Sequence, residues 1–398
     1  MIILVLNSGS SSLKYQLINT QTKLLLAKGN FERIGQQSAF LTHKIGEEKH
    51  KFEMDVPDHE MALNIILGKL TSKTFGVISG VDCIDAIGHR IVHGGDKFTS
   101  SVLINDEVIK QIEECIPLAP LHNPAALEGI KACMEILPGK PNVACFDTAF
   151  HQTMAKEQYI YPIPYKYYEK YKIRKYGFHG ISHDYVSHRI ASLKGVPIED
   201  LRIVNCHLGQ GASICAINKG KSVETSMGFT PVAGIPMGTR SGDLDPSVVT
   251  YIMKKENLKP DEMDRILNYQ SGIYGVSGAS VDFRDVEAEA AAGDHRSDLA
   301  MKIFLYDVAQ KIAEYAVAMQ GIDVITFTAG VGEKGMEDRE AICEYLKCFG
   351  VKIDKEVNNH KNIEAKISTP DSKIEVWVVP TNEELLIAED TERILRMY

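Results

Sequence analysis

A short loop near the start of the chain has the residue types of a phosphate-binding loop. Residues 7–14 read Asn-Ser-Gly-Ser-Ser-Ser-Leu-Lys and join two apolar runs. The glycine permits close approach to the backbone, and the lysine can reach a phosphate oxygen. Serine-rich hairpin turns without a ligand have the same composition, because serine also bonds to its own backbone. On this loop alone, both interpretations stay open.

Two later turns also place glycines directly after apolar runs. Residues 207–213 read His-Leu-Gly-Gln-Gly-Ala-Ser, and residues 327–334 read Phe-Thr-Ala-Gly-Val-Gly-Glu-Lys. No segment completes a P-loop or a dinucleotide fingerprint, since Cys215 stands where a P-loop ending in Gly220-Lys221-Ser222 needs its first glycine. We interpret the three turns together as phosphate or nucleotide sites, and Gly220 as an ordinary hairpin turn.

A long segment rich in glycine and proline carries an arginine between small residues. Residues 226–246 lack helical or strand periodicity, which predicts a long ordered loop. Arg240 within it can project a guanidinium fork toward a carboxylate or a phosphate. An exposed arginine with no ligand is the alternative.

Histidines gather in four short segments, around His93, His122, His151 and His179. A zinc site would need a His-Glu-x-x-His motif or Cys/His pairs at ligand spacing, and the sequence has neither. Neutral donors to phosphate oxygens fit the pattern better. Any single one of these histidines can also be a buried structural residue.

Two acidic positions lie where strands end. Asp147 follows the apolar run 143–146, and an acid there commonly faces a ligand. Near the C-terminus, a strand at 376–379 leads to Thr381-Asn382 and then to Glu383-Glu384 at the start of a helix. Asn or Thr as the cap, with one glutamate in the first turn, explains part of this pattern. The other glutamate remains for a metal or a ribose.

The elements that position these residues occur twice along the chain. Apolar runs separated by polar turns predict a β-meander at 2–6, 13–18 and 23–27 and a second one at 202–206, 213–217 and from 221 onward. A shift of 200 residues places Gly9 on Gly209, which a duplicated domain explains and which two unrelated hairpins could also produce. The pattern favours two α/β domains facing a cleft. Helical periodicity predicts helices at 105–116, 123–136, 181–194, 246–256, 297–320 and 337–349.

Composition excludes several classes of protein. The chain has 398 residues, 44% of them hydrophobic and 24% charged, as in ordinary globular proteins. Its net charge of −9 argues against nucleic acid as a partner. The 8 cysteines form no Cys-x-x-Cys pair and predict reduced core thiols. Neither a signal peptide nor a membrane span is predicted, so we expect a cytoplasmic protein.

Eight motifs, in order along the whole length, resemble the acetokinase family of the sugar kinase, Hsp70 and actin superfamily. Glu224 and Lys175 depart from the family's usual Asp and Arg at positions that carry no chemistry in the family. The motifs are VLNSGSSSLK, GHRIVHGG, FDTAFHQTM, YGFHGISH, HLGQGAS, SMGFTPVAGIPMGTRSGDLDP, FTAGVGE and TNEELLIAEDT.

The resemblance implies two duplicated ribonuclease H-like domains of the actin-like ATPase type, flanking a cleft, and a cytoplasmic homodimer. The N-terminal domain, on the acetate side, would hold residues 1–149 and 384–398, and the C-terminal domain, on the nucleotide side, residues 150–383. The implied reaction is reversible, direct in-line transfer of the γ-phosphoryl group of ATP to acetate, giving acetyl phosphate and ADP. It requires Mg²⁺, with Mn²⁺ as a possible substitute.

Site residues carry over position by position. Asn7 and Glu383 match the metal positions, and Asp147 matches the active-site acid. The catalytic group also includes Arg90, His179 and Arg240, and Arg90 binds acetate as well. The substrate pocket would be lined by Val92, Leu121, His122, Phe178 and Pro231. The nucleotide would bind to Ser10, Ser12, Lys14, His207, Leu208, Gly209, Gln210, Gly211, Asp282, Phe283, Arg284, Gly330, Val331, Gly332, Glu333 and Lys334.

Two alternatives remain. A propionate or butyrate kinase would differ only in the pocket wall, where Val92 favours a small substrate. A non-metabolic ATP-binding protein of the Hsp70 or actin type would share the phosphate loops, but Arg90, His179 and Arg240 argue against it.

Overall fold

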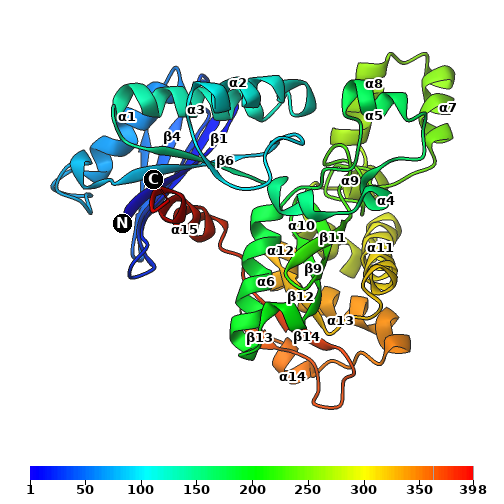
Figure 1. The fold of residues 1–398 in the computed structure, drawn as a ribbon. Helices are drawn as coiled ribbons and strands as arrows, with labels where there is room; N and C mark the ends of the chain where they lie inside the picture. Colours follow the sequence, from blue (N-terminus) through cyan, green and yellow to red (C-terminus); the bar gives the residue numbers. More distant parts are fainter. Residues whose placement is uncertain (362, 398) are drawn as a thin grey trace. The chain divides into compact units, whose positions relative to one another are not determined.

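The computed structural model describes residues 1–361 and 363–397, which form two compact units (Figure 1). The first holds Met1–Phe150 and the C-terminal segment from Asn382, and the second holds His151–Thr381. The division after Thr381 places Glu383 in the first unit, whereas the family resemblance implied residues 150–383 for the second. The reason is that Glu383 opens a helix that packs on the first sheet.

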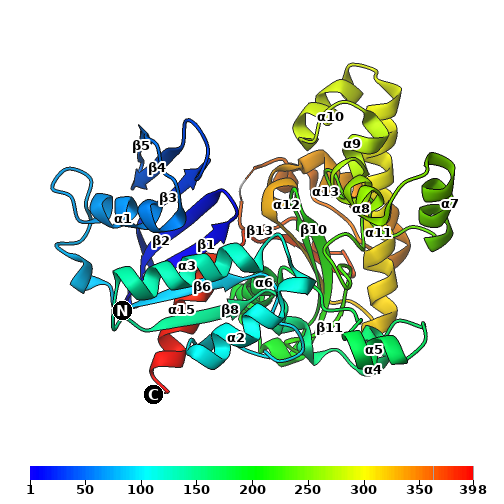
Figure 2. The same cartoon turned by 90° about the horizontal axis from the view of Figure 1, so that it is seen from above.

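An eight-stranded mixed sheet forms the first unit, in the order β5-β4-β3-β2-β1-β6-β8-β7. At its centre β1 pairs with β2 antiparallel and with β6 parallel, and β6 pairs with β8 parallel. Figure 2 shows β1 to β5 following one another across the sheet. The strands are β1 (Ile2–Gly9), β2 (Ser12–Asn19), β3 (Leu24–Glu32), β4 (Phe40–Ile45), β5 (Glu48–Glu53), β6 (Ala86–Ile91), β7 (Val102–Leu103) and β8 (Asn142–Phe146).

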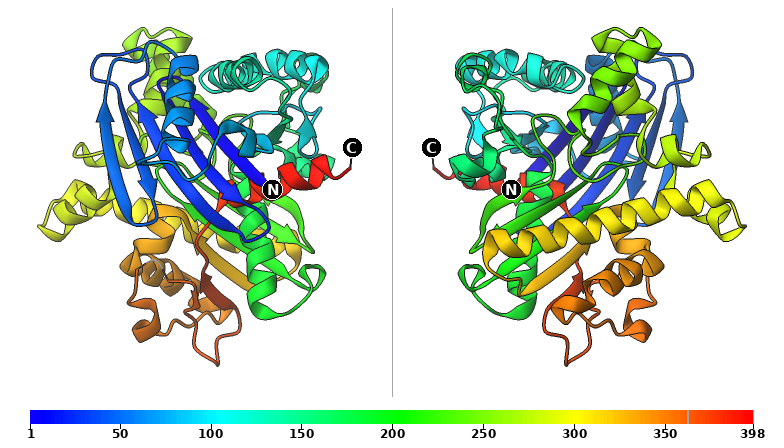
Figure 3. Two further views of the ribbon diagram at one scale, coloured as in Figure 1. Left: turned by 90° about the vertical axis from the view of Figure 1, so that its left-hand side faces the viewer. Right: turned by 90° about the vertical axis from the view of Figure 1, so that its right-hand side faces the viewer.

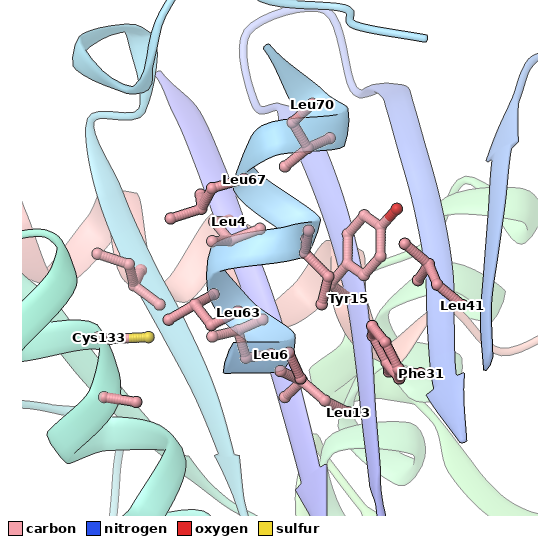
Figure 4. Packing of buried hydrophobic residues seen from close by; sticks show 14 of the residues in the cluster. Leu4, Leu6, Leu13, Tyr15, Phe31, Leu41, Leu63, Leu67, Leu70 and Cys133 are labelled. Carbon is pink, nitrogen blue, oxygen red and sulfur yellow. The ribbon is translucent and has the colours of Figure 1, made fainter. Parts of the chain in front are cut away.

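Helices cover both faces of this sheet. α1 (His59–Leu70), α2 (Asp106–Glu114) and α3 (Asn123–Ile136) lie on one side, and α15 (Glu383–Leu395) packs against β1, β6 and β8. Figure 4 shows Leu63, Leu67 and Leu70 of α1 on side chains of β1 to β4, among them Leu4 and Phe31. α15 lies so close to β6 that a Cβ added to Gly88 would come within 2.6 Å of Ile387 and Thr391. Both faces of the central strands are therefore buried.

A six-stranded sheet in the order β11-β10-β9-β12-β14-β13 forms the second unit. Here β9 pairs with β10 antiparallel and with β12 parallel, and β12 pairs with β14 parallel. The strands are β9 (Arg202–Leu208), β10 (Ala212–Asn218), β11 (Lys221–Thr225), β12 (Val324–Thr328), β13 (Ala365–Lys366) and β14 (Glu375–Val378).

Two helices hold this sheet between them. The 25-residue helix α11 (His295–Met319) runs along β9, β10 and β11, as Figure 3 shows, and α6 (Gly180–Lys194) packs on β9. Shorter helices surround this core: α4 (Lys156–Tyr159), α5 (Lys166–Tyr171), α7 (Pro246–Glu256), α8 (Pro260–Tyr269), α9 (Gly272–Ser277), α10 (Phe283–Ala291), α12 (Ala329–Lys334), α13 (Met336–Tyr345) and α14 (Lys355–Asn358).

The same strand order occurs in both units. β3-β2-β1-β6-β8 in the first corresponds to β11-β10-β9-β12-β14 in the second, with the same parallel and antiparallel pairings. Of the two explanations left open for the shift of 200 residues, the duplicated α/β fold, which the family resemblance also implies, is therefore confirmed. The turns differ, because Gly9 pairs with Ser12 across a two-residue turn whereas three residues separate Leu208 from its partner Ala212. Along the described part of the chain, every helix is too short or too polar to span a bilayer.

Candidate active site

The loop between β1 and β2 brings together part of the predicted phosphate-binding set. Asn7 and Lys14 are direct partners in the antiparallel ladder, so their side chains lie on one face of the sheet. Ser10 is exposed at the turn, and Ser12 pairs with Gly9. The loop is held from outside by His59, whose Nε2 donates to the Gly9 carbonyl over 2.7 Å.

Arg90, Asp147 and Glu383 form a charged cluster in the same unit. Arg90 lies at the end of β6 and Asp147 just past the end of β8, and these strands are parallel neighbours. The guanidinium donates from Nε to Asp147 Oδ1 over 3.1 Å and from Nη2 to Oδ2 over 2.8 Å. Its Nη1 lies 3.0 Å from Glu383 Oε2. Among residues 1–361 and 363–397, these contacts engage three of its five N–H groups, which leaves two for a ligand.

Burial and mutual contact shift the pKa values of the groups in this cluster. Burial alone would lower the pKa of the Arg90 guanidinium, but Asp147 and Glu383 hold that pKa above its ordinary value. Burial raises the pKa of Glu383 to about 7, with Arg90 opposing the shift and Asp147 adding to it. The helix cap at this point is Asn382, whose side chain accepts from the Leu385 amide. Glu383 is therefore available for a role other than capping.

The predicted substrate-wall residues divide between the units. Val92 and His122 lie in segments that Asn123 ties together, since its side chain bonds both the N–H and the C=O of His93. Leu121 is 59% exposed. Phe178 and Pro231 belong to the second unit, where Phe178 is buried.

In the second unit, Arg240, His179 and the turn after β9 converge. A Cβ added to Gly211 would meet Arg240 Nη1 at 3.4 Å and the His179 imidazole at 3.6 Å. Burial lowers the pKa of the Arg240 guanidinium. Within residues 1–361 and 363–397 no carboxylate forms an ion pair with it. Arg240 is thus a partly buried cation whose charge is left for an anion.

His179 is held in an uncommon backbone conformation. Its φ of 56° is left-handed, which costs a residue other than glycine about 1–2 kcal/mol. Its ring stacks on His207, with centroids 4.2 Å apart, and His207 Nδ1 lies 2.8 Å from the Ser182 hydroxyl. Both imidazoles are therefore oriented by neighbours before any ligand binds.

A pocket of about 490 Å³ lies beside the turns that follow β9 and β12. It is large enough for a nucleotide. The sequence had singled out eight of its lining residues: Gly209, Gln210, Asp282, Phe283, Arg284, Gly330, Val331 and Lys334. It had missed Glu287, Gly335 and Lys361, of which Glu287 lies one helical turn after Phe283 and was the easiest to find.

Several residues expected at the nucleotide also serve the fold, and some of them do not line the pocket. The Leu208 side chain is fully buried, and Phe283 packs on Phe304 as well as lining the pocket. Glu333 accepts from the Ala329 amide over 2.9 Å and so closes the tight turn at Ala329, whose φ is 64°. Gly332 is buried within α12.

Comparison with known proteins gives one consistent result. The model of the acetokinase family matches residues 2–389. The acetate kinase of Thermoanaerobacterium thermosaccharolyticum is 57% identical over 99% of this chain and 98% of its own length. The crystal structure of Porphyromonas gingivalis acetate kinase superposes with a TM-score of 0.96 at 46% identity, covering 99% of both chains. A propionate kinase from Francisella tularensis superposes with a TM-score of 0.93 at 41% identity, again over 99% of both chains. With its duplicated fold, its arginines and its glycine turns, the chain belongs to the acetokinase family.

Proposed function

We propose that the chain is an acetate kinase, which transfers the γ-phosphoryl group of ATP reversibly to the carboxylate of acetate. The observation that carries this proposal is Arg240, a partly buried guanidinium beside Gly211 and His179 with no carboxylate partner among the described residues. An uncompensated cation next to a glycine turn and an imidazole is suited to a transferring phosphoryl group. A protein that only binds ATP has no need of it.

The first unit binds the acceptor in this proposal. Acetate is ionised at neutral pH, so it attacks without a general base. The two N–H groups left on Arg90 bind its carboxylate and offset the repulsion between acetate and ATP. Asp147 holds the Arg90 guanidinium in a fixed plane through two parallel bonds, which makes it an orienting residue rather than a proton acceptor.

The second unit binds the nucleotide. The 490 Å³ pocket takes the base and ribose, and the turn at 209–211 approaches the phosphates through its backbone. Lys334 and Lys361 add positive charge at the rim, whereas the charge of Arg284 is paired with Asp282. His179 and Arg240 contact the phosphoryl group as charge spreads over its oxygens. Ser10, Ser12 and Lys14 of the first unit also serve the phosphates, and His207 orients His179 by stacking.

The donor set of the first unit fits a magnesium ion. Asn7, Asp147 and Glu383 offer the amide and carboxylate oxygens that Mg²⁺ prefers, and Mn²⁺ accepts the same donors. No three His, Cys, Asp or Glu side chains within residues 1–361 and 363–397 form a ready metal cage. We infer that Asn7 and Glu383 hold the ion largely through water. When bound, the ion neutralises charge on the ATP phosphates.

Trapping of acyl phosphate with hydroxylamine tests this proposal directly. Purified chain, ATP and Mg²⁺ are incubated with acetate, propionate or butyrate, and the hydroxamate is measured. Acetate is expected to give the highest kcat/KM. A preference for propionate would instead assign the activity of the Francisella tularensis relative, and ATP hydrolysis without hydroxamate for any acid would refute the kinase assignment.

We also propose that the chain is a cytoplasmic homodimer. All eight cysteines are free thiols, as a reducing compartment maintains. Leu299, Ile303 and Tyr306 form an exposed apolar stripe on α11, at helical spacing, that a second copy would cover. Sedimentation of the wild-type chain beside an Ile303→Lys variant tests this, because only the wild type should sediment as a dimer.

A further inference from the structure

A chain of buried polar side chains leads from the middle of the second sheet to His179. The Thr326 hydroxyl donates to Asn205 Oδ1 over 2.7 Å, and Asn205 Nδ2 lies 2.8 Å from His183 Nδ1. His183 Nε2 lies 2.8 Å from the Ser213 hydroxyl, which lies 2.9 Å from His179 Nδ1. Thr326, Asn205, His183 and Ser213 are all fully buried. These hydrogen-bonded side chains are therefore shielded from water and cannot exchange protons with it along this path.

The Asn205 amide has an acceptor oxygen at one end and a donor nitrogen at the other, and this fixes which atom donates in each hydrogen bond of the series. Thr326 donates to Oδ1, so Nδ2 is the amide end that faces His183 and donates to its Nδ1. Burial keeps the pKa of His183 well below its ordinary value, so its imidazole is neutral and carries one proton. That proton sits on Nε2 and is donated to Ser213, which in turn donates its own proton to His179 Nδ1.

The donor-to-acceptor direction of these hydrogen bonds decides whether the second ring nitrogen of His179, Nε2, carries a proton or a lone pair. With Nδ1 accepting from Ser213, a neutral His179 carries its proton on Nε2, the nitrogen nearest Gly211 and close to Arg240. The reverse direction would turn a lone pair toward the oxygens of a phosphoryl group, which repel it. A protonated His179 would donate its Nδ1–H to the Ser213 oxygen and, among the contacts of the described residues, leave the buried hydroxyl proton of Ser213 without an acceptor.

We propose that Ser213 and His183 are positioning residues that hold His179 in the neutral form with its proton on Nε2, as a fixed hydrogen-bond donor to the transferring phosphoryl group. The catalytic consequence rests on the proposed kinase function, whereas the position of the proton does not. The two can therefore be tested separately.

The tautomer of His179 is read by ¹⁵N NMR of the full chain labelled at histidine. The His179 signals are those lost in a His179→Gln variant. In the wild type we expect Nδ1 of the pyridine type and Nε2 of the pyrrole type. Ser213→Ala should give a mixture of both tautomers, and Ser213→Thr, which keeps the hydroxyl, should restore the wild-type signals. A wild-type His179 with its proton on Nδ1, or an unchanged tautomer in Ser213→Ala, overturns the proposal.

Kinetics separate positioning from simple structural support. Ser213→Ala should lower kcat about tenfold and leave both KM values within about twofold, because the lost contact strengthens only in the transition state. Ser187→Ala is the matched control: Ser187 is equally buried, on α6, and within the described part of the chain its hydroxyl bonds only to the Asp184 carbonyl. It should leave kcat and the tautomer unchanged. Equal loss of kcat in both variants would overturn the positioning role.

A second variant covers the case in which Ser213→Ala does not fold. Thr326→Val removes the donor that orients the Asn205 amide, so His183 and His179 should both show mixed tautomers. If they do not, the direction assigned to the chain is wrong. A wild type that has the expected tautomer but forms no hydroxamate refutes the kinase function alone.

Discussion

The two arginines of the proposed site are held in opposite ways. Arg90, in the first unit, is bound by Asp147 and Glu383 through three nitrogen atoms. Arg240, in the second unit, has the Met237 sulfur 3.7 Å from Nη1 and no ion-pair partner among the described residues. The carboxylates fix the plane of the Arg90 guanidinium and also neutralise part of its positive charge. The positive charge of Arg240 is not neutralised in this way and can act on an incoming anion. A small fixed carboxylate suits the first arrangement, and a phosphoryl group that gains charge suits the second.

Replacing each arginine should have the largest effect on activity and should test whether the two are held differently. Arg90→Ala and Arg240→Ala should each lower kcat/KM about a hundredfold or more, since a charged donor in a site shielded from water contributes about 3 kcal/mol. Their stabilities should diverge. Arg90→Ala leaves two carboxylates without their cation and should lower the melting temperature, whereas Arg240→Ala relieves a buried charge and should not.

Arg202→Ala is the control for these variants. Arg202 pairs with Asp323 at the surface of the second unit, where an ion pair contributes less than about 1 kcal/mol. Turnover and melting temperature should stay near the wild-type values. Wild-type turnover in either active-site variant would remove that arginine from the mechanism.

Buried neutral histidines are a feature that the units share, and they should make the fold sensitive to acid. Burial lowers the pKa values of His89 in the first unit and His151 in the second to about 4. The unfolded chain binds these protons near pH 6.5, so stability should fall as the pH drops from 6.5 toward 4. Each group contributes about 1.4 kcal/mol per pH unit, or about 2 kcal/mol at pH 5.

Urea unfolding at pH 7 and pH 5 measures this loss. His89→Gln removes one of the titrating groups from the first unit and should reduce the difference between the two pH values by about 2 kcal/mol for the transition of that unit. The same pH dependence in variant and wild type would show that His89 is not neutral in the folded state.

The N-terminus of α15 allows the metal role of Glu383 to be separated from helix capping. Glu383→Gln should raise the Mg²⁺ concentration needed for half-maximal activity about tenfold, as loss of an indirect metal contact does. Asn382→Ala removes the cap and should lower stability by about 1 kcal/mol without changing the Mg²⁺ requirement. Identical Mg²⁺ titrations of Glu383→Gln and the wild type would exclude the metal role.

The smallest effect is expected at the substrate wall of the first unit. Val92→Ala should move the kcat/KM ratio toward propionate by about tenfold. The added space admits the extra methylene of propionate, whose burial contributes about 0.8 kcal/mol, and it removes the steric strain of fitting that group beside Val92. Acetate should bind more weakly, because its methyl group loses contacts. Both acids are compared in one preparation. An unchanged ratio with a lower melting temperature would mean that Val92 is only a core residue.

Sequence patterns predicted the regular elements where hydrophobic periodicity was strong. α3 (Asn123–Ile136) and α7 (Pro246–Glu256) have the bounds that the sequence predicted, and the apolar runs at 2–6 and 202–206 became β1 and β9. β6 (Ala86–Ile91) was missed as a strand, because His89 and Arg90 interrupt its apolar character. Asn142 explains how this strand stays buried, since its Oδ1 accepts from His89 Nε2 over 2.7 Å.

What the sequence determined by itself was the glycine turns at strand ends and the family motifs, because these depend on residues close together in the chain. The shift of 200 residues raised the duplication as one of two explanations, and the shared strand order decided between them. Only the tertiary structure decided which side chains form ion pairs and which form buried hydrogen bonds with one another. Arg90, Asp147 and Glu383 are far apart in sequence and meet because parallel neighbours and a returning helix bring them to one edge of a sheet. Ser213 and His183 look like ordinary turn and helix residues until the fold removes water from around them. Burial forces each of their hydrogens to a single partner, and no local pattern contains that constraint.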